Sequence, residues 1–381
     1  MTSILPEKRA LKKPRILIAT GIFPPQVGGP ATYSKLLLDT LPQKGFPVIV
    51  VSFGEVLRYP KILRHGIYFF KVLRKALSSD VVYAQDPVSV GFPALIASKI
   101  LGKKFYLKIV GDYAWEQGTQ RFGVVDLLDT FSKTPSGYPF FVQGLKRIQR
   151  FVAHHADTVI VPSNYLKTVV TNWGIEGSHI HVIYNAFQTP HDWLSRIEAR
   201  KKLGIEYPAI ISAGRLVRWK GFDTLIKLMP DIAREIPTAK LFIAGDGPDS
   251  AYLRKTIIEV GAEDSVIMLG KLSQSDLFDY IAASNLFVLN TSYEGLSHQL
   301  LEVMFLKTPI LTTDVGGNPE VVESGKNGLL VTYNDTSALR KAIVELLHDQ
   351  QKQNAFTSAG GLKLNEFSQD QMLGSLTKLF Q

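Results

Sequence analysis

Two glutamates eight residues apart, Glu294 and Glu302, stand on either side of a short stretch that begins with a glycine and runs into an apolar helix pattern. The preceding segment, residues 285–292, has the pattern of a buried strand, so Glu294 and Gly295 come just past its carboxyl end. Ser297 is a suitable N-cap for the helix that follows. In parallel α/β sheets ligands bind outside the carboxyl ends of the strands. The stretch therefore predicts a ligand site.

The helix start between the two glutamates is suited to an anion. Backbone N–H groups and the positive end of the helix dipole at residues 297–299 favour a phosphate. Glu302 lies five residues further along, about 7 Å away at 1.5 Å per residue. Carboxylates accept hydrogen bonds from hydroxyls and repel phosphate, so each belongs beside a sugar ring. A nucleotide sugar fits this arrangement, and the alternative is a helix that simply carries a polar residue at each end.

Cations follow another strand pattern. In AIISAGRLVRWKGFDTLI (209–226), Arg215 and Lys220 stand between a strand and a helix, which places both over the same sheet edge. Arginine offers a planar fork for two phosphate oxygens and lysine a compact charge. The turn at 245–248 and the pair Gly316-Gly317 add further strand-end turns, which alone would fit any tight turn. These residues predict a diphosphate site, with solvated surface cations as the alternative.

The elements that must position these residues alternate between short apolar runs and helix patterns. This alternation predicts an α/β protein with two doubly wound parallel sheets, in two Rossmann-like domains. We expect an N-terminal domain over 1–186, a second over 187–361, and a helix over 362–381, after a break at Gly360-Gly361, that packs back on the first. The region 113–140 lacks periodicity and predicts a long functional loop or short helices. The expected strands lie within 15–21, 47–54, 80–86, 104–112, 157–163, 181–187, 209–216, 239–246, 265–270, 285–292, 309–315 and 328–331.

Length and composition narrow the class of protein. The 381 residues are 45% hydrophobic and include no cysteine, which excludes thiol catalysis and zinc–thiolate sites. No apolar run reaches the roughly 18 to 20 residues of a membrane span. The basic start, residues 1–15, lacks an apolar secretory segment. We therefore expect a cytoplasmic enzyme. The predicted junction between the domains, residues 188–208, is polar and rich in helix breakers.

The net charge of +9 is unevenly distributed along the chain. Residues 1–185 hold 23 Lys and Arg against 11 Asp and Glu, whereas the remainder holds 20 against 23. One basic cluster, residues 58–75, is interspersed with Leu, Ile, Tyr and Phe. It predicts either a solvated basic surface or a surface attracted to anionic lipid, with peripheral attachment to the inner face of the membrane, or to an acidic acceptor. No nucleic-acid module pattern accompanies the charge, so nucleic acid is not an expected partner.

Taken in order, these motifs resemble the family 4 glycosyltransferases of GT-B architecture, in which two Rossmann-like domains face a cleft. The resemblance covers most of the chain and is dense in its second half. It implies a retaining, metal-independent hexosyltransferase that uses a UDP- or GDP-sugar as co-substrate and no other cofactor. The acceptor would be a hydroxyl group of a sugar, glycan or glycolipid. The matching segments are PPQVGGPATYS (24–34), GRLVRWKG (214–221), AGDGP (244–248), the two spaced glutamates and PILTTDVGGNPEVV (309–322).

The resemblance also implies a role for each site residue. Glu294 would contact the transferred sugar, and Glu302 the ribose hydroxyls. Arg215 and Lys220 would hold the diphosphate and neutralise the charge that builds on the leaving nucleotide. Main-chain atoms near Gly270 and Lys271 would meet the base, and glycines of the first domain would let its loop approach the phosphates. The implied donor site also contains Gly28, Gly29, Gly214, Gly245, Gly247, Gly295, Leu296, Ser297, His298 and Gln299.

One position departs from the family pattern. Many members carry a His-Asp pair after the fourth strand of the first domain, and here the pair reads Gly111-Asp112. Asp112 is the candidate for orienting or deprotonating the acceptor hydroxyl, and its alternative is a structural role in a turn.

Two other functions stay open from the sequence. One is an epimerase that acts on a nucleotide sugar without an acceptor, and the other is a non-catalytic module that binds sugar nucleotides. A nicotinamide dehydrogenase is disfavoured, because G-x-G-x-x-G follows the first strand of neither domain.

Overall fold

The structure is a computed structural model that describes residues 12–26, 28–187 and 193–381. The chain divides into two compact units. Unit 1 contains Met1–Val161, Lys167–Ile183 and Leu373–Gln381, and unit 2 contains Pro162–Leu166 and Tyr184–Met372. Most of the basic start and residues 188–192 of the predicted junction lie outside the described residues. Among the described helices, none is both long and apolar enough to span a bilayer.

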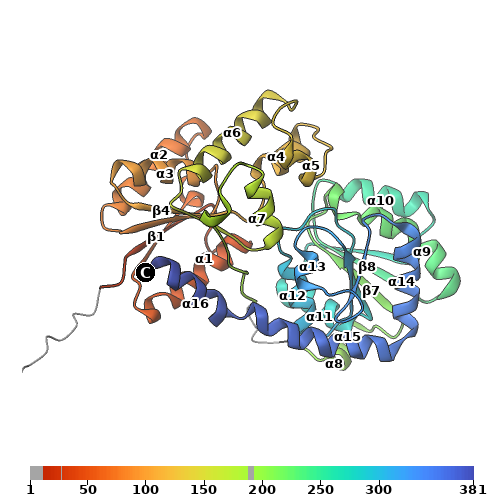
Figure 1. The fold of residues 1–381 in the computed structure, drawn as a ribbon. Helices are drawn as coiled ribbons and strands as arrows, with labels where there is room; N and C mark the ends of the chain where they lie inside the picture. The colour runs from red at the N-terminus through yellow and green to blue at the C-terminus, as the bar shows by residue number, and fades with distance from the viewer. Residues whose placement is uncertain (1–11, 27, 188–192) are drawn as a thin grey trace, which may run out of the picture. The chain divides into compact units, whose positions relative to one another are not determined.

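Unit 1 is built on a six-stranded parallel sheet. Its strands are β1 (Ile16–Thr20), β2 (Val48–Ser52), β3 (Val81–Ala84), β4 (Lys104–Lys108), β5 (Thr158–Val161) and β6 (Ile180–Val182), in the order β2-β1-β3-β4-β5-β6. Its helices are α1 (Gly29–Thr40), α2 (Lys61–Ala76), α3 (Gly91–Ile100), α4 (Tyr113–Arg121), α5 (Leu128–Lys133), α6 (Phe140–His154), most of α7 (Asn164–Thr171) and the end of α16 (Gln369–Phe380). Figure 1 shows α2, α3 and α6 on one face of the sheet and α1 with α16 on the other. Strands β1 and β3 are fully buried, as expected for strands covered on both faces.

The end of the chain completes the core of unit 1. The ring of Phe380 lies 6.3 Å from that of Phe46 and 5.7 Å from those of Tyr83 and Tyr106, measured between ring centres. The hydroxyl of Tyr106 also donates to the carbonyl of Leu379 at 2.9 Å. The last turn of α16 is therefore an integral part of the aromatic core beside β3 and β4.

The region 113–140 forms two short helices, α4 and α5, as one of the two sequence alternatives predicted. Lys146 of α6 fixes the second helix, because its ammonium donates to the carbonyls of Phe131 at 2.8 Å and Thr134 at 2.6 Å. The same ammonium lies 4.0 Å from the centre of the Phe131 ring. Burial lowers the pKa of Lys146 to about 8. At least one cation of the basic first half is therefore structural, because it links α6 to α5.

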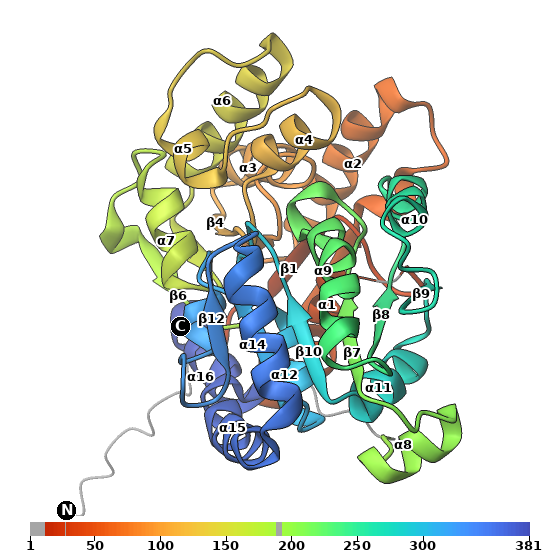
Figure 2. The same ribbon diagram turned by 90° about the vertical axis from the view of Figure 1, so that its right-hand side faces the viewer.

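Unit 2 repeats the architecture. Its sheet has the order β12-β11-β10-β7-β8-β9, and all its strand pairs are parallel. Its strands are β7 (Ala209–Ala213), β8 (Lys240–Ala244), β9 (Val266–Gly270), β10 (Leu286–Leu289), β11 (Ile310–Thr313) and β12 (Leu329–Val331). Its helices are α8 (Arg196–Leu203), α9 (Phe222–Glu235), α10 (Ser250–Glu259), α11 (Gln274–Ala283), α12 (His298–Phe305), α13 (Asn318–Val321), α14 (Thr336–His348) and α15 (Gln350–Lys363). Figure 2 shows α9 and α14 side by side in front of the sheet.

Two hydrophobic clusters line the two faces of this second sheet. One packs α9, α10 and α14 against it, and the other packs α8, α11 and α12. Each of the observed strands overlaps a segment that the sequence predicted, so the two doubly wound parallel sheets are confirmed. The predicted helix break at Gly360-Gly361 is wrong, because α15 continues through both glycines to Lys363. Gly360 is buried where the helix approaches Met304 of α12, and a Cβ there would lie 3.4 Å from the Met304 side chain.

Candidate functional site

An ion pair between Lys220 and Glu294 lies at the carboxyl edge of the unit 2 sheet. Lys220 closes a 3-10 turn (Arg218–Lys220) after β7, and Glu294 follows β10, the neighbouring strand. The ammonium donates to Oε1 of the carboxylate, and each side chain is only 15% exposed. Because water screens it little, this pair interacts more strongly than a surface pair. The sequence placed both residues in one site, and the structure brings them into contact.

Backbone hydrogen bonds hold the two loops of the pair in place. The carbonyl of Trp219 accepts from the N–H of Ser292 at 2.7 Å, which ties the Lys220 loop to the end of β10. The N–H of Gly317 donates to the carbonyl of Glu294 at 2.8 Å. Gly316 has φ of +59°, and a Cβ at this position would lie 2.1 Å from the Glu294 carbonyl oxygen. The Gly316-Gly317 turn therefore serves to position the glutamate.

The glycines after β8 bring further loops together. A Cβ on Gly245 would lie 1.8 Å from the carbonyl oxygen of Gly214, and one on Gly247 would lie 2.3 Å from that of Leu216. Gly245 also donates to the carbonyl of Gly270 at 2.8 Å. These close contacts give the predicted donor-site glycines a packing role between the ends of β7, β8 and β9.

Helix α12 begins directly after the Glu294 turn. Ser297 caps it, since its hydroxyl accepts from the N–H of Leu300 at 3.4 Å, and this confirms the predicted cap. The carbonyl of Gly295 accepts from the buried hydroxyl of Ser163 at 2.5 Å. Leu296 is buried, and His298 is exposed in the first turn. The first amide groups of α12 thus stand next to the ion pair at the sheet edge.

Glu302 has different surroundings from Glu294. It lies one turn into α12, and its carboxyl accepts from the side-chain amide of Gln274 at 3.5 Å. Burial raises the pKa of Glu302 to about 7. One of the two spaced glutamates thus pairs with a cation, whereas the half-buried Glu302 has a raised pKa. Lys271, after β9, is exposed just before α11.

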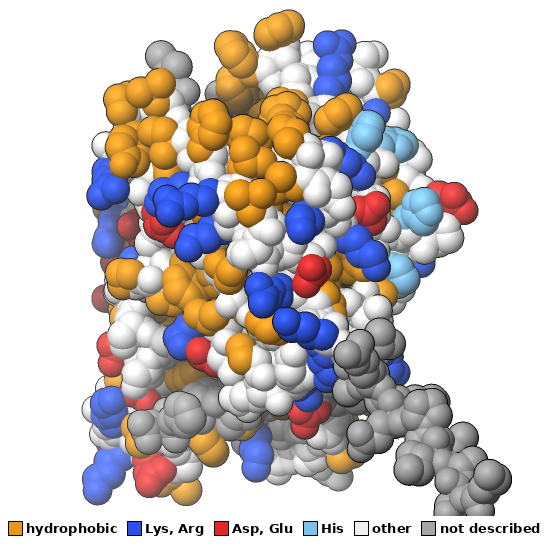
Figure 3. Space-filling model, turned by 90° about the vertical axis from the view of Figure 1, so that its left-hand side faces the viewer, with side chains coloured by type: hydrophobic (Ala, Val, Ile, Leu, Met, Phe, Trp, Pro, Cys, Tyr) orange, Lys and Arg blue, Asp and Glu red, His pale blue; other side chains and the backbone are white. Residues whose placement is uncertain are grey.

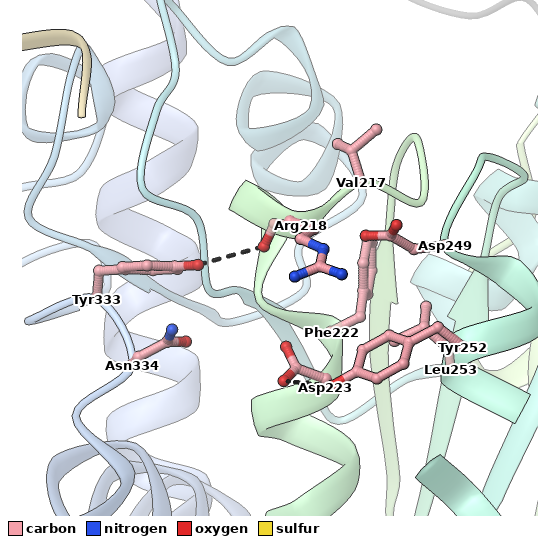
Figure 4. Close-up of a pocket in the computed structure, with 9 residues that line it drawn as sticks. All are labelled: Val217, Arg218, Phe222, Asp223, Asp249, Tyr252, Leu253, Tyr333 and Asn334. Carbon is pink, nitrogen blue, oxygen red and sulfur yellow. Dashed lines mark hydrogen bonds between the residues drawn. The ribbon is translucent and has the colours of Figure 1, made fainter. Parts of the chain in front are cut away.

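A pocket of about 240 Å³ lies beside the same loop (Figure 4), and neither residue of the ion pair lines it. The side chain of Arg218 extends into it, and its guanidinium lies 5.9 Å from the ring centre of Tyr252. Asp223 and Asp249 also line the pocket, and burial raises the pKa of Asp249. Two carboxylates disfavour a phosphate here. None of the predicted site residues lines this pocket, and Arg215 is exposed on the surface.

Unit 1 has a pocket of about 160 Å³ at the carboxyl ends of β1, β3 and β4. Gln85 lines it, and its side-chain carbonyl accepts from the hydroxyl of Ser34 at 3.0 Å. Its amide nitrogen is buried and has no hydrogen-bond partner among the described residues. The neighbouring Asp86 accepts from the N–H groups of Val88 and Ser89, at 2.8 and 2.6 Å. Sequence reasoning missed both residues, although two polar side chains at a strand end were the available signal.

Asp112 is a helix cap in the interior of unit 1. It has no exposed surface, and its Oδ1 accepts from the N–H of Trp115 and the side-chain amide of Gln149, both at 2.9 Å. Burial raises its pKa. These contacts match the structural alternative for Asp112, whereas Gly111 and Glu116 on either side of it line the pocket. Gly28 and Gly29 lie at the start of α1 in the same unit.

Within residues 12–26, 28–187 and 193–381, no group of three or more His, Cys, Asp or Glu side chains is arranged to hold a metal ion.

Comparisons with known proteins agree with this architecture. The family model described as Glycosyltransferase Family 4 matches residues 27–189, and the model described as Glycosyl transferases group 1 matches residues 195–362. The two matches together span most of the chain.

Curated relatives are glycosyltransferases of several kinds. One is the GDP-mannose-dependent alpha-(1-6)-phosphatidylinositol monomannoside mannosyltransferase of Mycobacterium tuberculosis, 32% identical over 177 residues, which cover 44% of this chain and 46% of the relative. The chain spans about half the length of the mannosyltransferases it matches. Another relative is the N-acetyl-alpha-D-glucosaminyl L-malate synthase of Bacillus anthracis, 25% identical over 86% of each chain.

Solved structures share the fold. HepE of Anabaena in complex with UDP-glucose aligns with a TM-score of 0.73 at 22% identity, over 96% of this chain and all of that chain. The sucrose-phosphate synthase of Thermosynechococcus elongatus aligns with a TM-score of 0.78 at 19% identity, over 96% and 98%. The two parallel sheets with flanking helices are thus the GT-B fold. With that fold and the two family models, the chain belongs to the family 4 glycosyltransferases.

Proposed function

We propose that the protein transfers a sugar from a nucleoside diphosphate sugar to a hydroxyl group, with retention of the anomeric configuration. Family membership supplies the reaction class. The observation that carries the proposal is the shielded pair of Lys220 and Glu294 next to the start of α12. The cation and the helix amino end suit the diphosphate of such a donor, and the carboxylate suits its sugar hydroxyls.

Donor binding would separate the ion pair. The ammonium of Lys220 would move to the diphosphate, and the carboxylate of Glu294 would accept hydrogen bonds from the sugar hydroxyls. Each charged group exchanges one hydrogen-bond partner for others, so neither is left without a partner. As the bond to the leaving diphosphate breaks, Lys220 and the first amide groups of α12 would stabilise the growing negative charge. The exposed Arg215 in the same loop is proposed as a second cation for the phosphates.

The second glutamate is proposed to bind the ribose. Hydrogen bonds from ribose hydroxyls favour the ionised carboxylate, which burial disfavours before the donor binds. Donor binding at neutral pH should therefore release a proton from Glu302. Calorimetry of donor binding in buffers of different ionisation enthalpy would detect this release.

The nature of the donor and acceptor follows from relatives only as a proposal. The mycobacterial relative is named for GDP-mannose, and HepE was solved with UDP-glucose, so we propose a UDP- or GDP-sugar. The acceptor is proposed to be a hydroxyl of a sugar, glycan or glycolipid. We assign it to the unit 1 pocket, where the buried amide of Gln85 could donate to a ligand oxygen. We further propose a cytoplasmic enzyme that needs no metal, so a chelator should leave its rate unchanged.

Lys220→Met tests the proposal. The variant should release nucleoside diphosphate from the cognate donor about a hundredfold more slowly than the wild type. Lys227→Met is the matched control, since it removes a lysine of the neighbouring helix that pairs with Asp223 on the surface. Equal rates for the wild type and Lys220→Met would overturn the proposal. Turnover of donor alone to an isomeric sugar nucleotide would instead identify an epimerase.

A further inference from the structure

Helices α2, α3 and α6 of unit 1 expose hydrophobic side chains in lines along their outer surfaces. On α3, Phe92, Ile96 and Ile100 are spaced four residues apart and share one side of the helix. On α2 and its C-cap, Leu63, Phe70 and Leu77 are spaced seven residues apart and likewise share one side of the helix. We call the outer surface of these three helices the docking face. Its exposed hydrophobic residues are Leu63, Phe70, Leu77, Phe92, Ile96, Ile100, Phe140, Phe141 and Phe151. Ile100 is 63% exposed and Phe140 is 81% exposed, so these side chains are not part of the core.

The three helices form one continuous surface. Helix α3 contacts both α2 and α6, and the rings of Phe92 and Phe151 lie 6.3 Å apart between centres. Figure 3 shows hydrophobic side chains gathered on this face of unit 1, with Lys and Arg side chains beside them. A patch of this extent on a protein surface usually marks an interaction site.

The charge of the docking face has a single sign. The sequences of α2, α3 and α6 contain nine Lys or Arg residues and no Asp or Glu. Lys146 points inward, Lys71 pairs with Glu55 at 2.6 Å, and Lys99 lies 3.9 Å from Asp157. Arg74, Lys75 and Arg147 are exposed, and no acidic residue of their own helices can neutralise them. A partner that fits this face would therefore be both apolar and negatively charged.

We propose that unit 1 docks through this face on a lipid bilayer that contains anionic headgroups. The exposed phenylalanines and isoleucines would enter the boundary between headgroups and acyl chains, and the cations would contact the lipid phosphates. A second copy of the chain is a poorer occupant, because two faces of the same positive charge would repel each other. The proposal concerns attachment rather than chemistry, so it does not depend on the proposed sugar transfer.

Vesicle sedimentation tests the proposal with the full-length chain and without any sugar donor. The wild type should sediment with vesicles of phosphatidylcholine and phosphatidylglycerol at low salt, and much less with phosphatidylcholine alone. The triple variant Phe70→Ser, Ile100→Ser, Phe141→Ser should lower the partition coefficient roughly tenfold or more. Reversal of charge in Arg74→Glu, Lys75→Glu, Arg147→Glu should have at least as large an effect on anionic vesicles and little effect on neutral ones.

Unit 2 offers a matched control. Ile197→Ser, Ile258→Ser, Leu362→Ser removes three side chains that are equally exposed but lie outside the docking face, and should leave vesicle binding unchanged. Thermal unfolding of each variant checks that it folds. Equal sedimentation of the wild type and both docking-face variants would overturn the proposal. So would a dimer, found by analytical ultracentrifugation without lipid, that the Phe70 triple variant dissociates.

Discussion

The carboxyl edges of the two sheets differ in what their charged side chains bind. In unit 1, Asp86 accepts hydrogen bonds from backbone amides of the turn before α3, and Asp112 accepts one from the first turn of α4. In unit 2, Glu294 binds another side chain, Lys220. A carboxylate that satisfies backbone amides cannot leave them without exposing unpaired N–H groups. A carboxylate that pairs with a lysine can exchange the lysine for a ligand. In unit 2, Glu294 is therefore able to bind a ligand.

The outer surfaces differ as well. Among the described residues, eighteen large hydrophobic side chains are exposed, and thirteen of them belong to unit 1. The first half of the chain also carries the excess of positive charge. We infer that the two units have different functions. Unit 2 would bind the donor, whereas unit 1 would attach to the lipid bilayer and bind the acceptor in its pocket.

The largest predicted effect concerns the stability of unit 1 alone. Phe380→Ala should lower its free energy of unfolding by about 4 kcal/mol, because it removes a buried ring from an aromatic core. Hydrogen exchange resolved by peptide should show faster exchange in β3 and β4 and unchanged exchange in β7 and β10. Phe70→Ala, at an exposed phenylalanine of the same unit, is the control and should change stability by less than about 0.5 kcal/mol. Uniform loosening of both units would instead show that they unfold together rather than separately.

The next largest effect concerns enzyme activity and the ion pair at the carboxyl edge of the unit 2 sheet. Lys220→Met and Glu294→Gln should each raise the activation free energy by about 3 kcal/mol, which lowers kcat/KM for the donor roughly a hundredfold. The double variant should lose much less than the sum, because the two residues act as a pair. Additive losses in steady-state kinetics would show that the two side chains act independently.

A smaller effect tests the pH dependence of Glu302. Its folded pKa, about 7, exceeds the ordinary value of 4.5. Between these values the folded state keeps a proton that the unfolded state has lost, so stability falls as pH rises from 4.5 through 7. Glu302→Gln cannot ionise and should therefore be more stable than the wild type by about 2 kcal/mol at pH 8, with no gain at pH 4. Chemical unfolding at both pH values would measure the difference, and Glu263→Gln, at an exposed site, should show none.

The smallest effect distinguishes a cap from an acid–base group at Asp112. Asn retains an oxygen that can accept from Trp115 and Gln149, so Asp112→Asn should cost about 1 kcal/mol or less in stability and change turnover less than threefold. Asp112→Ala removes the acceptor and should cost about 2 kcal/mol. A hundredfold loss of turnover in a stable Asp112→Asn protein would instead assign it to the chemistry.

The sequence predicted those features that depend on short-range patterns. The buried runs located both sheets, and Ser297 marked the start of α12 because a cap and its helix are neighbours in sequence. The contact of Lys220 with Glu294 joins residues 74 positions apart, and Gln149 reaches Asp112 across 37. Such partners depend on how the strands are ordered, which periodicity does not encode. The continuation of α15 through Gly360 likewise depends on packing against Met304.

We propose that the ion pair at the edge of unit 2 is the donor site. A crystal structure of the protein with a bound nucleoside diphosphate sugar would test this assignment. We predict the diphosphate within hydrogen-bonding distance of the Lys220 ammonium and the first amides of α12, with a sugar hydroxyl on Glu294. A donor bound in the pocket around Arg218, or in unit 1, with Lys220 and Glu294 still paired, would show that the ion pair is not the donor site.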